Sequence, residues 1–489
     1  MDILDKLTQA SSTTEDLESF LEINNNFMEL YDFFITQSFQ NLNAYNSKMA
    51  SYILPKYAIY SQLDFSKPNC KTFTSFLLDA SERFGWLLEF QQLYQLHINE
   101  NIDITNRLEA ASLYLIGIIN IGNYIDRIPE VLQLLSKGSL EEEDEEDKII
   151  STLVNYYAQV VHNFSNQNKE GVLKFKNALT TKIKQLEYSF LSTETLTDVL
   201  EVDISNNVEA HDKIQIILDG FLSRTNKYLP FNNHRFIIEE NTEYANLLIE
   251  PKYTFQDIRK IAVDLYQKVA SDKIFYSLQR GVKILNEPNQ LIAYMHSFGN
   301  MHKAKITSAL EGIPPDIFLG TTEIYDWGCG QGLASYIALE QNPKIKPNVT
   351  LIEPSELALK RAALHVSKFV PQNNIITINK DIDSLIKKDF NTNNSHIKIH
   401  LFSNILDIDL FSMTNLINLI KQSFSGTNYF ICVSPYINST KTNRLTNFVE
   451  AFKEYDNFHI LESINEPKGS WSGTNWSRVV RVFKADIET

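Results

Sequence analysis

The chain has 489 residues, and this length predicts two to four domains, because a single hydrophobic core stops growing beyond roughly 250 residues. The composition, with 43% hydrophobic, 11% aromatic and 21% charged residues, excludes collagen-like, mucin-like and wholly disordered chains. The net charge of −15 is uneven, since residues 1–314 hold 28 Lys and Arg against 42 Asp and Glu, whereas residues 315–489 hold 17 against 18. This acidity opposes general attraction to nucleic-acid phosphates and favours solubility.

The cysteines and the apolar runs bear on the compartment. Cys70, Cys329 and Cys432 are too scattered for a disulfide framework or a cysteine-based zinc site. No run reaches the roughly 20 apolar residues of a membrane span, and the acidic N-terminus does not resemble a signal peptide. We therefore expect a reduced, cytoplasmic protein without a metal site or a membrane segment.

Residues 1–250 are expected to form an acidic, mainly helical region, because apolar residues recur with a period near 3.6. The ranges 73–96 and 108–135 show this period clearly. Tyr114 and Tyr157 lie in two related stretches, which indicates either a helix-hairpin repeat or an ordinary bundle. The seven consecutive acids at 141–147 predict a solvated loop.

The central part of the chain is less regular. Residues 236–238 and 247–249 are predicted to be short strands or helix ends, and the boundary near 250 is approximate. Residues 251–315 form a helical leader, which ends at Gly312 and the following proline pair, since prolines cannot continue a helix.

From 316 to 489 predicted strands and helices alternate, which is typical of an α/β domain with a mostly parallel, doubly wound sheet of seven strands. The last two strands have no helix between them and should form an antiparallel hairpin. The strands are expected at 323–326, 349–353, 375–379, 397–403, 429–433, 459–464 and 479–484, and the helices at 333–340, 355–369, 382–387, 413–424 and 441–454.

A glycine-rich turn joins the first strand to its helix and reads Asp326-Trp327-Gly328-Cys329-Gly330-Gln331-Gly332. Alternate glycines allow a tight turn that brings a ligand against bare N–H groups at a helix N-terminus. Glu353 ends the second strand, where a carboxylate can accept both hydroxyls of a ribose. Asp381 and Ile382 follow the third strand and suit an adenine ring. All of them should lie at the carboxyl ends of the strands.

At these residues the chain resembles the class I S-adenosylmethionine-dependent methyltransferases over about 175 residues. The resemblance implies S-adenosylmethionine as the cofactor and places substrate-side and catalytic residues after the fourth strand. It implies cofactor contacts for Asp326, Trp327, Gly328, Gly330, Gln331, Gly332, Glu353, Asp381, Ile382 and Ser403, and catalytic or substrate roles for Asn404 and Asp407.

A fainter resemblance links the helical leader and the Glu353-Pro354-Ser355 step to ribosome-associated methyltransferase-like proteins, although the metal-binding cysteines of that group are missing. The Asn-Pro-Pro-Tyr type motif of enzymes that methylate base amines is also absent after the fourth strand. Methylation of an exocyclic base amine is therefore not supported.

Several single residues have two interpretations. Cys329 is expected to pack, and Trp327 either covers the cofactor or fills the core. Asn404 binds substrate or the methionine end, or caps the next helix, and Asp407, like Asp409, is a base or a solvated helix start. The remaining candidates are Tyr294, His296 and His302, in the core or on a lid helix, and Trp471, Asn475 and Trp476, at a substrate mouth or plugging the sheet end.

We predict a methyltransferase that transfers a methyl group to an acceptor N, O or C atom mainly by positioning it, while the helical region holds an RNA or protein acceptor. Three alternatives stay open. They are a non-catalytic methyltransferase-like scaffold, a nicotinamide oxidoreductase, which the turn spacing and terminal hairpin oppose, and a helical-repeat adaptor with a vestigial C-terminal domain.

Overall fold

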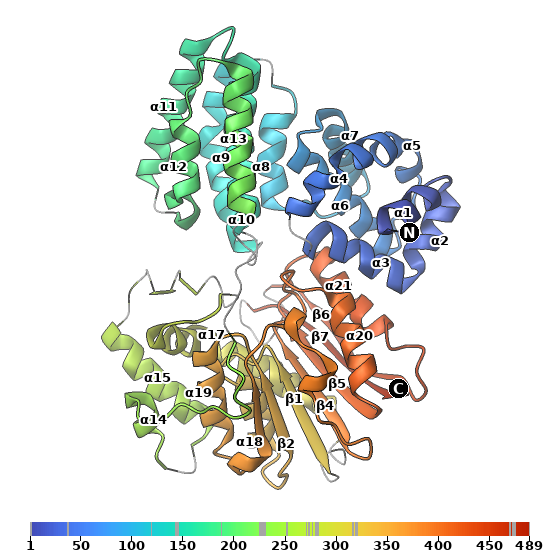
Figure 1. Cartoon of the computed structure of the whole chain (residues 1–489), viewed down its shortest axis with the longest axis vertical. Coiled ribbons are helices and arrows are strands. Elements are labelled where there is room, and N and C mark those ends of the chain that lie inside the picture. Colours follow the sequence, from blue (N-terminus) through green and yellow to red (C-terminus); the bar gives the residue numbers. More distant parts are fainter. Residues whose placement is uncertain are drawn as a thin grey trace. The chain divides into compact units, whose positions relative to one another are not determined.

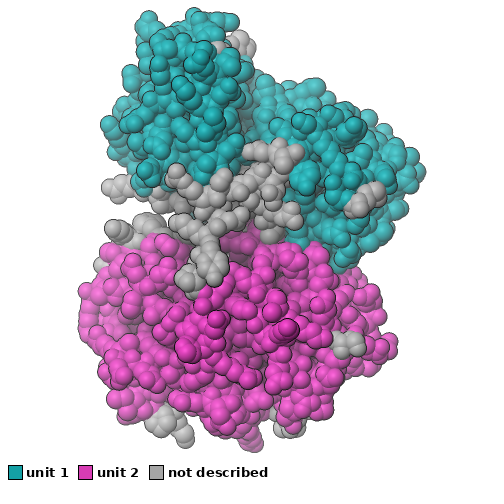
Figure 2. Space-filling view, in the orientation of Figure 1, with its two compact units in different colours: residues 1–228 teal, residues 229–489 magenta. Residues whose placement is uncertain are grey.

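The computed structural model describes residues 2–36, 39–118, 120–141, 146–186, 188–223, 231–250, 253–269, 271, 274–275, 277–278, 283–314, 317, 321–468, 471 and 476–488. The chain divides into two compact units, Met1–Tyr228 and Leu229–Thr489, which Figure 2 colours separately. The division lies at 228/229 and not at the predicted 250, because the segment after 230 packs on the sheet of unit 2. None of the described helices is long and apolar enough to cross a membrane.

Unit 1 is helical throughout its described residues (Figure 1). The predicted helix 73–96 is two helices, because Gly85 ends the first in a left-handed conformation with φ +67°. The predicted acidic loop lies outside the described residues at 142–145, and its flanks belong to helices. The α-helices are α1 (Ile3–Ala10), α2 (Thr14–Glu22), α3 (Asn24–Tyr31), α4 (Phe39–Tyr52), α5 (Tyr57–Tyr60), α6 (Pro68–Phe84), α7 (Leu87–Asn99), α8 (Asn106–Leu115), α9 (Ile121–Glu141), α10 (Glu146–Phe164), α11 (Lys169–Gln185), α12 (Glu194–Glu201) and α13 (Asn207–Ser223).

A buried ionic cluster lies between α6, α8 and α10 of unit 1. Arg107 is 2% exposed, and its Nη1 donates to Glu82 Oε2 at 2.9 Å and to Thr152 Oγ1 at 3.2 Å. Its Nη2 donates to Asp79, and Lys148 Nζ lies 3.4 Å from the other oxygen of that carboxylate. Each buried acid therefore has a cation beside it, as a buried charge requires.

Unit 2 contains a seven-stranded sheet in its described part, with strand order β3-β2-β1-β4-β5-β7-β6. The pairs along β3-β2-β1-β4-β5 are parallel, and β7 is antiparallel to both β5 and β6, which confirms the predicted hairpin. All seven predicted strands are present. Their bounds are β1 (Thr322–Trp327), β2 (Asn348–Ile352), β3 (Ile375–Ile378), β4 (Ile397–Ser403), β5 (Gly426–Ser434), β6 (His459–Glu466) and β7 (Arg478–Ile487).

Helices cover both faces of this sheet (Figure 1). Ile324 and Ile399 belong to an apolar cluster with α15, α17, α18 and α19. On the opposite face, Tyr325 contacts the ring of Phe424, directly after α20, and Phe430 contacts a ring of α21. The prediction of a helix at 382–387 is wrong, since two short 3₁₀ turns, Ile382–Ser384 and Lys387–Asp389, flank an extended Leu385. The helices are α14 (Glu243–Leu247), α15 (Phe255–Val269), α17 (Pro288–Glu311), α18 (Leu333–Gln341), α19 (Glu356–Val366), α20 (Met413–Ser423) and α21 (Ser439–Glu450).

The segment before α14 runs along the edge of the sheet without forming a strand. Thr377 of β3 donates its N–H to the carbonyl of Arg235 at 2.9 Å, and the N–H of Ile237 donates to Thr377 Oγ1 at 3.0 Å. The predicted strand at 236–238 is thus an extended edge segment, and Leu247 ends α14. This segment covers the otherwise open edge of β3.

The strand order reverses between β1 and β4. Chain connections lead from β1 outward to β2 and β3 on one side, and then to β4 and β5 on the other. At such a switch point the connecting loops separate and leave a crevice at the carboxyl ends of the strands.

Candidate functional site

A cavity of about 190 Å³ occupies this crevice. Its volume is more than ten times the roughly 10–15 Å³ that one water molecule requires. It is bounded by the carboxyl ends of β1, β2 and β4, the start of α18 and the polar face of α17. Of the predicted site residues, the cavity is lined by Asp326, Gly328, Gly330, Gln331, Glu353, Asp381, Ile382, Ser403 and Asn404.

The three glycines of the turn share a backbone conformation but differ in what surrounds them. Gly328, Gly330 and Gly332 all have positive φ, which costs little only without a Cβ. A Cβ on Gly328 would meet Ile405 Cδ1 at 2.6 Å, and one on Gly332 would meet Ala362 Cβ at 3.0 Å. A Cβ on Gly330 would have no atom within 4 Å, so this glycine keeps space open. The first and third glycines therefore serve packing, and the second serves the cavity.

Asp326 ends β1 with an incompletely bonded carboxylate. Its Oδ2 accepts hydrogen bonds from the Ser335 N–H at 3.1 Å and from Ser335 Oγ at 2.7 Å. Its Oδ1 is buried and has no hydrogen-bond partner among the described residues. Burial raises the pKa of Asp326 to about 6. The Ser335 hydrogen bonds lower this pKa, but they offset only part of the rise. The free oxygen is an acceptor available to a ligand in the cavity.

Glu353 follows β2 and faces the same cavity. Its Oε2 accepts the N–H of Gly330 at 2.9 Å, and its Oε1 accepts the N–H of Ser355 at 3.0 Å. Burial raises the pKa of Glu353 to about 7, and the Asp326 carboxylate adds to this rise. Neither carboxylate has an ion pair within the described part of the chain. Two buried acids without a counter-charge favour a ligand that is cationic and rich in hydroxyl groups.

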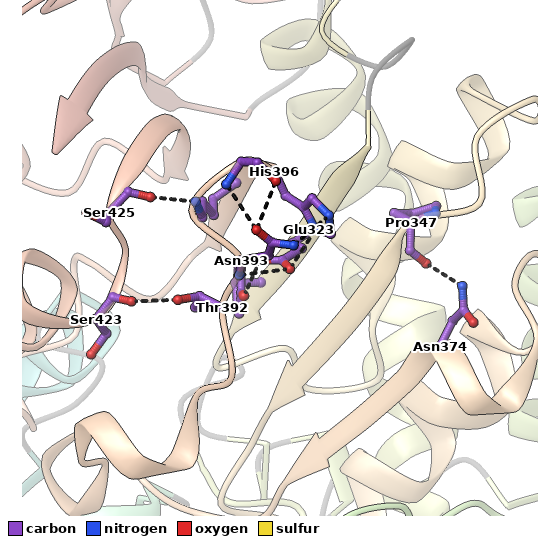
Figure 3. A network of polar contacts seen from close by, with 11 residues as sticks. Glu323, Pro347, Asn374, Thr392, Asn393, His396, Ser423 and Ser425 are labelled. Carbon is purple, nitrogen blue, oxygen red and sulfur yellow. Dashed lines mark hydrogen bonds and ion pairs between the residues drawn. The ribbon is translucent and has the colours of Figure 1, made fainter. Parts of the chain in front are cut away.

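Glu323, at the amino end of β1, contrasts with Asp326 at the carboxyl end of that strand (Figure 3). Glu323 is 5% exposed, and its Oε1 lies 2.9 Å from His396 Nδ1 and accepts the Asn393 N–H at 3.3 Å. Its Oε2 accepts the Tyr325 hydroxyl at 2.8 Å. Both oxygens are therefore occupied by protein groups, unlike those of Asp326 three residues later.

Three predicted site residues do not line the cavity. Trp327 is fully buried on the opposite face of the sheet, where its Nε1 donates to His400 Nδ1 at 3.2 Å and its ring stacks on Phe402. Asp407 is buried behind the cavity and accepts the Ser434 hydroxyl at 2.7 Å, and burial raises its pKa. Gly332 packs against α19. Trp327 is thus a core residue, and Asp407 is not placed to act as a base.

A polar cluster joins α17 to the end of β4. The Tyr294 hydroxyl lies 2.8 Å from His302 Nε2, and His302 Nδ1 lies 3.2 Å from Ser403 Oγ. Asn404 adopts φ +55°, donates its N–H to the Val433 carbonyl, and places its Nδ2 3.1 Å from the His302 ring. Burial lowers the pKa of His302 to about 3, so the imidazole is neutral. The sequence favoured core or lid roles for Tyr294 and His302, but both line the cavity.

A second set of contacts holds the glycine-rich turn from outside. His365 Nδ1 lies 2.8 Å from the carbonyl oxygen of Gln331, and its Nε2 lies 2.8 Å from the Tyr244 hydroxyl. A carbonyl can only accept, so Nδ1 carries the proton and Nε2 accepts from Tyr244. Arg361 stacks over Tyr244 at 3.6 Å and pairs with Glu239. The sequence did not indicate this connection, because it joins residues from three separate segments.

The far wall of the cavity is apolar. Ile382, Ile408, Leu410 and Phe411 line it, and Leu410 is 62% exposed at the rim. Asp381 caps the turn after β3 by accepting the Ser384 N–H at 2.7 Å. No group of three or more potential metal ligands occurs among the residues that the structure describes. The wall suits a flat, mostly apolar ring beside a polar edge.

No family model matches this sequence, and no curated protein matches it. Solved structures show a likeness at low identity. A protein from Listeria monocytogenes named as a class I S-adenosylmethionine-dependent methyltransferase is 13% identical, with 69% of this chain and 89% of that chain covered and a TM-score of 0.28. A methyltransferase from Leishmania major is 10% identical (45% and 90% covered, TM-score 0.29). Precorrin-6y C5,15-methyltransferase from Geobacter metallireducens is 13% identical (37% and 87% covered, TM-score 0.25).

Proposed function

We propose that unit 2 is a doubly wound, Rossmann-like methyltransferase domain that binds S-adenosylmethionine in the cavity at the β1/β4 switch point. The observation that carries this proposal is the pair of buried carboxylates, Asp326 and Glu353, which face one cavity without a counter-charge. S-Adenosylmethionine complements these features of the cavity. Its methionine end is cationic, its ribose has two hydroxyls for a carboxylate, and its base suits the apolar wall.

The residues present fit that group. The unpartnered Oδ1 of Asp326 would accept from the ammonium of the methionine part, and Glu353 would accept from the ribose hydroxyls. The space over Gly330 admits a ligand against the backbone, and Ile382 and Phe411 would flank the base. When bound, the cofactor supplies a methyl group on a positively charged sulfur, ready for displacement.

The chain itself contributes position and exclusion of water. Asn404 and Ser403 lie at the end of β4, where their hydrogen bonds with His302 of α17 hold both side chains in place. Because His302 is neutral, it acts as a hydrogen-bond partner and not as a strong base. Most of the rate would then come from holding the acceptor atom in line with the methyl group, which needs no strong base. The acceptor is proposed to be macromolecular, held in part by unit 1.

A non-catalytic scaffold is the second candidate, because Asp407, which the sequence offered as a base or a helix start, does not line the cavity and accepts a hydrogen bond from Ser434. The two candidates share cofactor binding and differ in turnover. Release of S-adenosylhomocysteine in the presence of candidate acceptors separates them.

The test is calorimetric titration of the full chain with S-adenosylmethionine and S-adenosylhomocysteine, with NADH as a control. Wild type should bind the first two. D326N keeps an oxygen for both Ser335 hydrogen bonds and replaces the free, charged acceptor with an NH2 donor. It should therefore weaken S-adenosylmethionine binding by about 10- to 150-fold, the equivalent of roughly 1.5–3 kcal/mol for a hydrogen bond to a charged group. Glu323 lies at the amino end of the same strand, β1, is also buried and has both oxygens bonded to protein groups, so E323Q is the matched control. Equal affinity in wild type and D326N would contradict the site.

A further inference from the structure

A second cavity, of about 580 Å³, lies on another face of α17. It is bounded by α17, the start of α15 and the residues that precede β7. Because β5 ends at Ser434 and pairs there with Val479, the start of β7 lies at the same edge of the sheet as the carboxyl end of β5. The cavity thus opens at the edge of the sheet that also carries the cofactor cavity, and nothing in the proposed function occupies it.

A rigid aromatic platform forms one wall. The ring of Trp471 is 9% exposed, and the Arg478 guanidinium lies 4.4 Å from its centroid. Arg478 is fixed in turn, since its Nε donates to Glu466 Oε2 at 2.6 Å and its Nη1 donates to Ser308. The half-buried ring of Trp476 lies 6.1 Å from Trp471 at an angle of 52°. Trp471 therefore supports Trp476, which lines the cavity.

The opposite wall carries polar groups of α17. Asn300 lines the cavity, and its Oδ1 is buried without a hydrogen-bond partner among the described residues. Lys303 makes no described ion pair, and its Nζ lies 5.7 Å from the ring of Phe255. Glu311 lies two helical turns further on, about 12 Å along the axis. The wall thus offers one cation, a separate acid and an amide.

We propose that this second cavity binds one base of a single-stranded nucleic acid, and that a neighbouring nucleotide of the same strand is the acceptor of the proposed methyl transfer. A base has a flat π-face that can stack on the Trp476 indole, and base stacking on aromatic side chains tolerates any sequence. Its edge offers donors and acceptors to Asn300 and Gln256, and an adjoining phosphate can reach Lys303. This inference rests on the proposed function for the identity of the reaction, but not for the binding itself.

The position and the charge of unit 2 agree with this assignment. Consecutive residues of α17, His302 and Lys303, line the cofactor cavity and the second cavity, respectively. A strand with one base on Trp476 would thus have a neighbouring nucleotide close to the cofactor cavity. Unit 2 holds 27 Lys and Arg against 27 Asp and Glu, so it has no net charge that would repel a polyanion. Stacking and not phosphate attraction should dominate.

The experiment measures anisotropy of labelled 12-nucleotide single strands, one RNA and one DNA of mixed sequence, titrated with the full chain. W476A should weaken binding by about 5- to 150-fold, the effect of losing one stacked base, and W476F should keep most of the affinity. With one phosphate contact, affinity should fall only about threefold between 50 and 200 mM salt. K303Q should remove that dependence, whereas K344Q, which changes an exposed lysine outside the cavity, should leave it intact.

Two outcomes would overturn the proposal. One is absence of binding to both strands, and the other is equal binding by wild type and W476A. A lysine-rich 12-residue peptide is titrated in parallel. If the peptide binds in a way that depends on Trp476 while neither nucleic-acid strand binds, the cavity is assigned to a protein acceptor instead. S-Adenosylmethionine is titrated into every variant, so a failure of the proposed function is seen separately from a failure of this cavity.

Discussion

The ionic cluster of unit 1 and the cavity of unit 2 treat buried charge in opposite ways. In unit 1, Asp79 and Glu82 are buried against Arg107 and Lys148, and every acid of the cluster has a cation beside it. In unit 2, Asp326 and Glu353 are as deeply buried but have only hydroxyl and backbone N–H partners. Burying a charge without a counter-charge costs stability, so the first arrangement serves the fold and the second points to a ligand.

The net charges of the two units differ in the opposite sense. Unit 1 holds 18 Lys and Arg against 33 Asp and Glu, whereas unit 2 is balanced at 27 against 27. The whole net charge of −15 therefore belongs to unit 1. An unpaired buried carboxylate in a neutral unit is more informative about function than many exposed acids in a charged one.

The largest expected effect is on unit 1. R107M would leave Asp79 and Glu82 buried with their main cation removed, which should lower the free energy of unfolding by about 3–5 kcal/mol. Urea unfolding of the full chain measures it. The matched control is K174A, which removes an exposed pair with Glu170 and should leave the free energy of unfolding nearly unchanged. Similar losses in R107M and K174A would contradict the structural role of the cluster.

The second prediction concerns how the stability of unit 2 depends on pH. There the two unpaired carboxylates destabilise the fold when they are ionised. Burial raises the pKa values of Asp326 and Glu353 to about 6 and 7, so the folded chain binds these protons more tightly than the unfolded chain does. Their contribution to stability is therefore full below about pH 4 and is lost as pH rises to about 7. For Asp326, a pKa of about 6 in place of the ordinary 3.8 corresponds to roughly 3 kcal/mol.

D326N isolates the contribution of Asp326 to this pH dependence. Without ligand, the variant should be more stable than wild type at pH 8, by up to roughly 3 kcal/mol, and the difference should shrink toward pH 4.5. S-Adenosylmethionine should behave in the opposite way, because its ammonium needs the ionised carboxylate, and wild-type affinity should rise between pH 5.5 and 8. Urea unfolding and calorimetry over this range test both trends. A D326N chain less stable than wild type at pH 8 would break the comparison.

The third prediction separates packing from ligand binding within one turn. An alanine at φ above zero costs roughly 1–2 kcal/mol. G332A should cost more, because its methyl group would meet Ala362 at 3.0 Å, and unfolding by urea should show the larger loss. G330A should destabilise the fold only by the cost of its backbone conformation, because its methyl group meets no other atom. That methyl group would enter the cavity, so G330A should weaken the binding of S-adenosylmethionine more than G332A does. The reverse order of affinities would contradict the assignment of these glycines.

Much of unit 2 could be predicted from the sequence because its signals are local. Alternating strand and helix patterns and the run Asp326–Gly332 need only neighbouring residues, and Glu353 follows from strand order. Of the two roles that the sequence left open for Trp327, strand geometry already favours the core, because successive residues of a strand face opposite sides and Asp326 faces the cavity. Tyr294 and His302 depend on which face of α17 meets β4, and local sequence does not determine this.

The smallest expected effect concerns the residues that hold the turn from outside. His365 is buried, burial lowers its pKa to about 4, and its Nδ1–H donates to the Gln331 carbonyl. We expect H365M to weaken S-adenosylmethionine about 3- to 10-fold by freeing that carbonyl, in line with the roughly 0.5–1.5 kcal/mol of one neutral hydrogen bond. H365N should restore most of the affinity, because its amide nitrogen takes the place of Nδ1. Since both variants lose the Tyr244 contact and much of the ring, a merely structural role would weaken both alike, whereas a positioning role predicts rescue by asparagine alone.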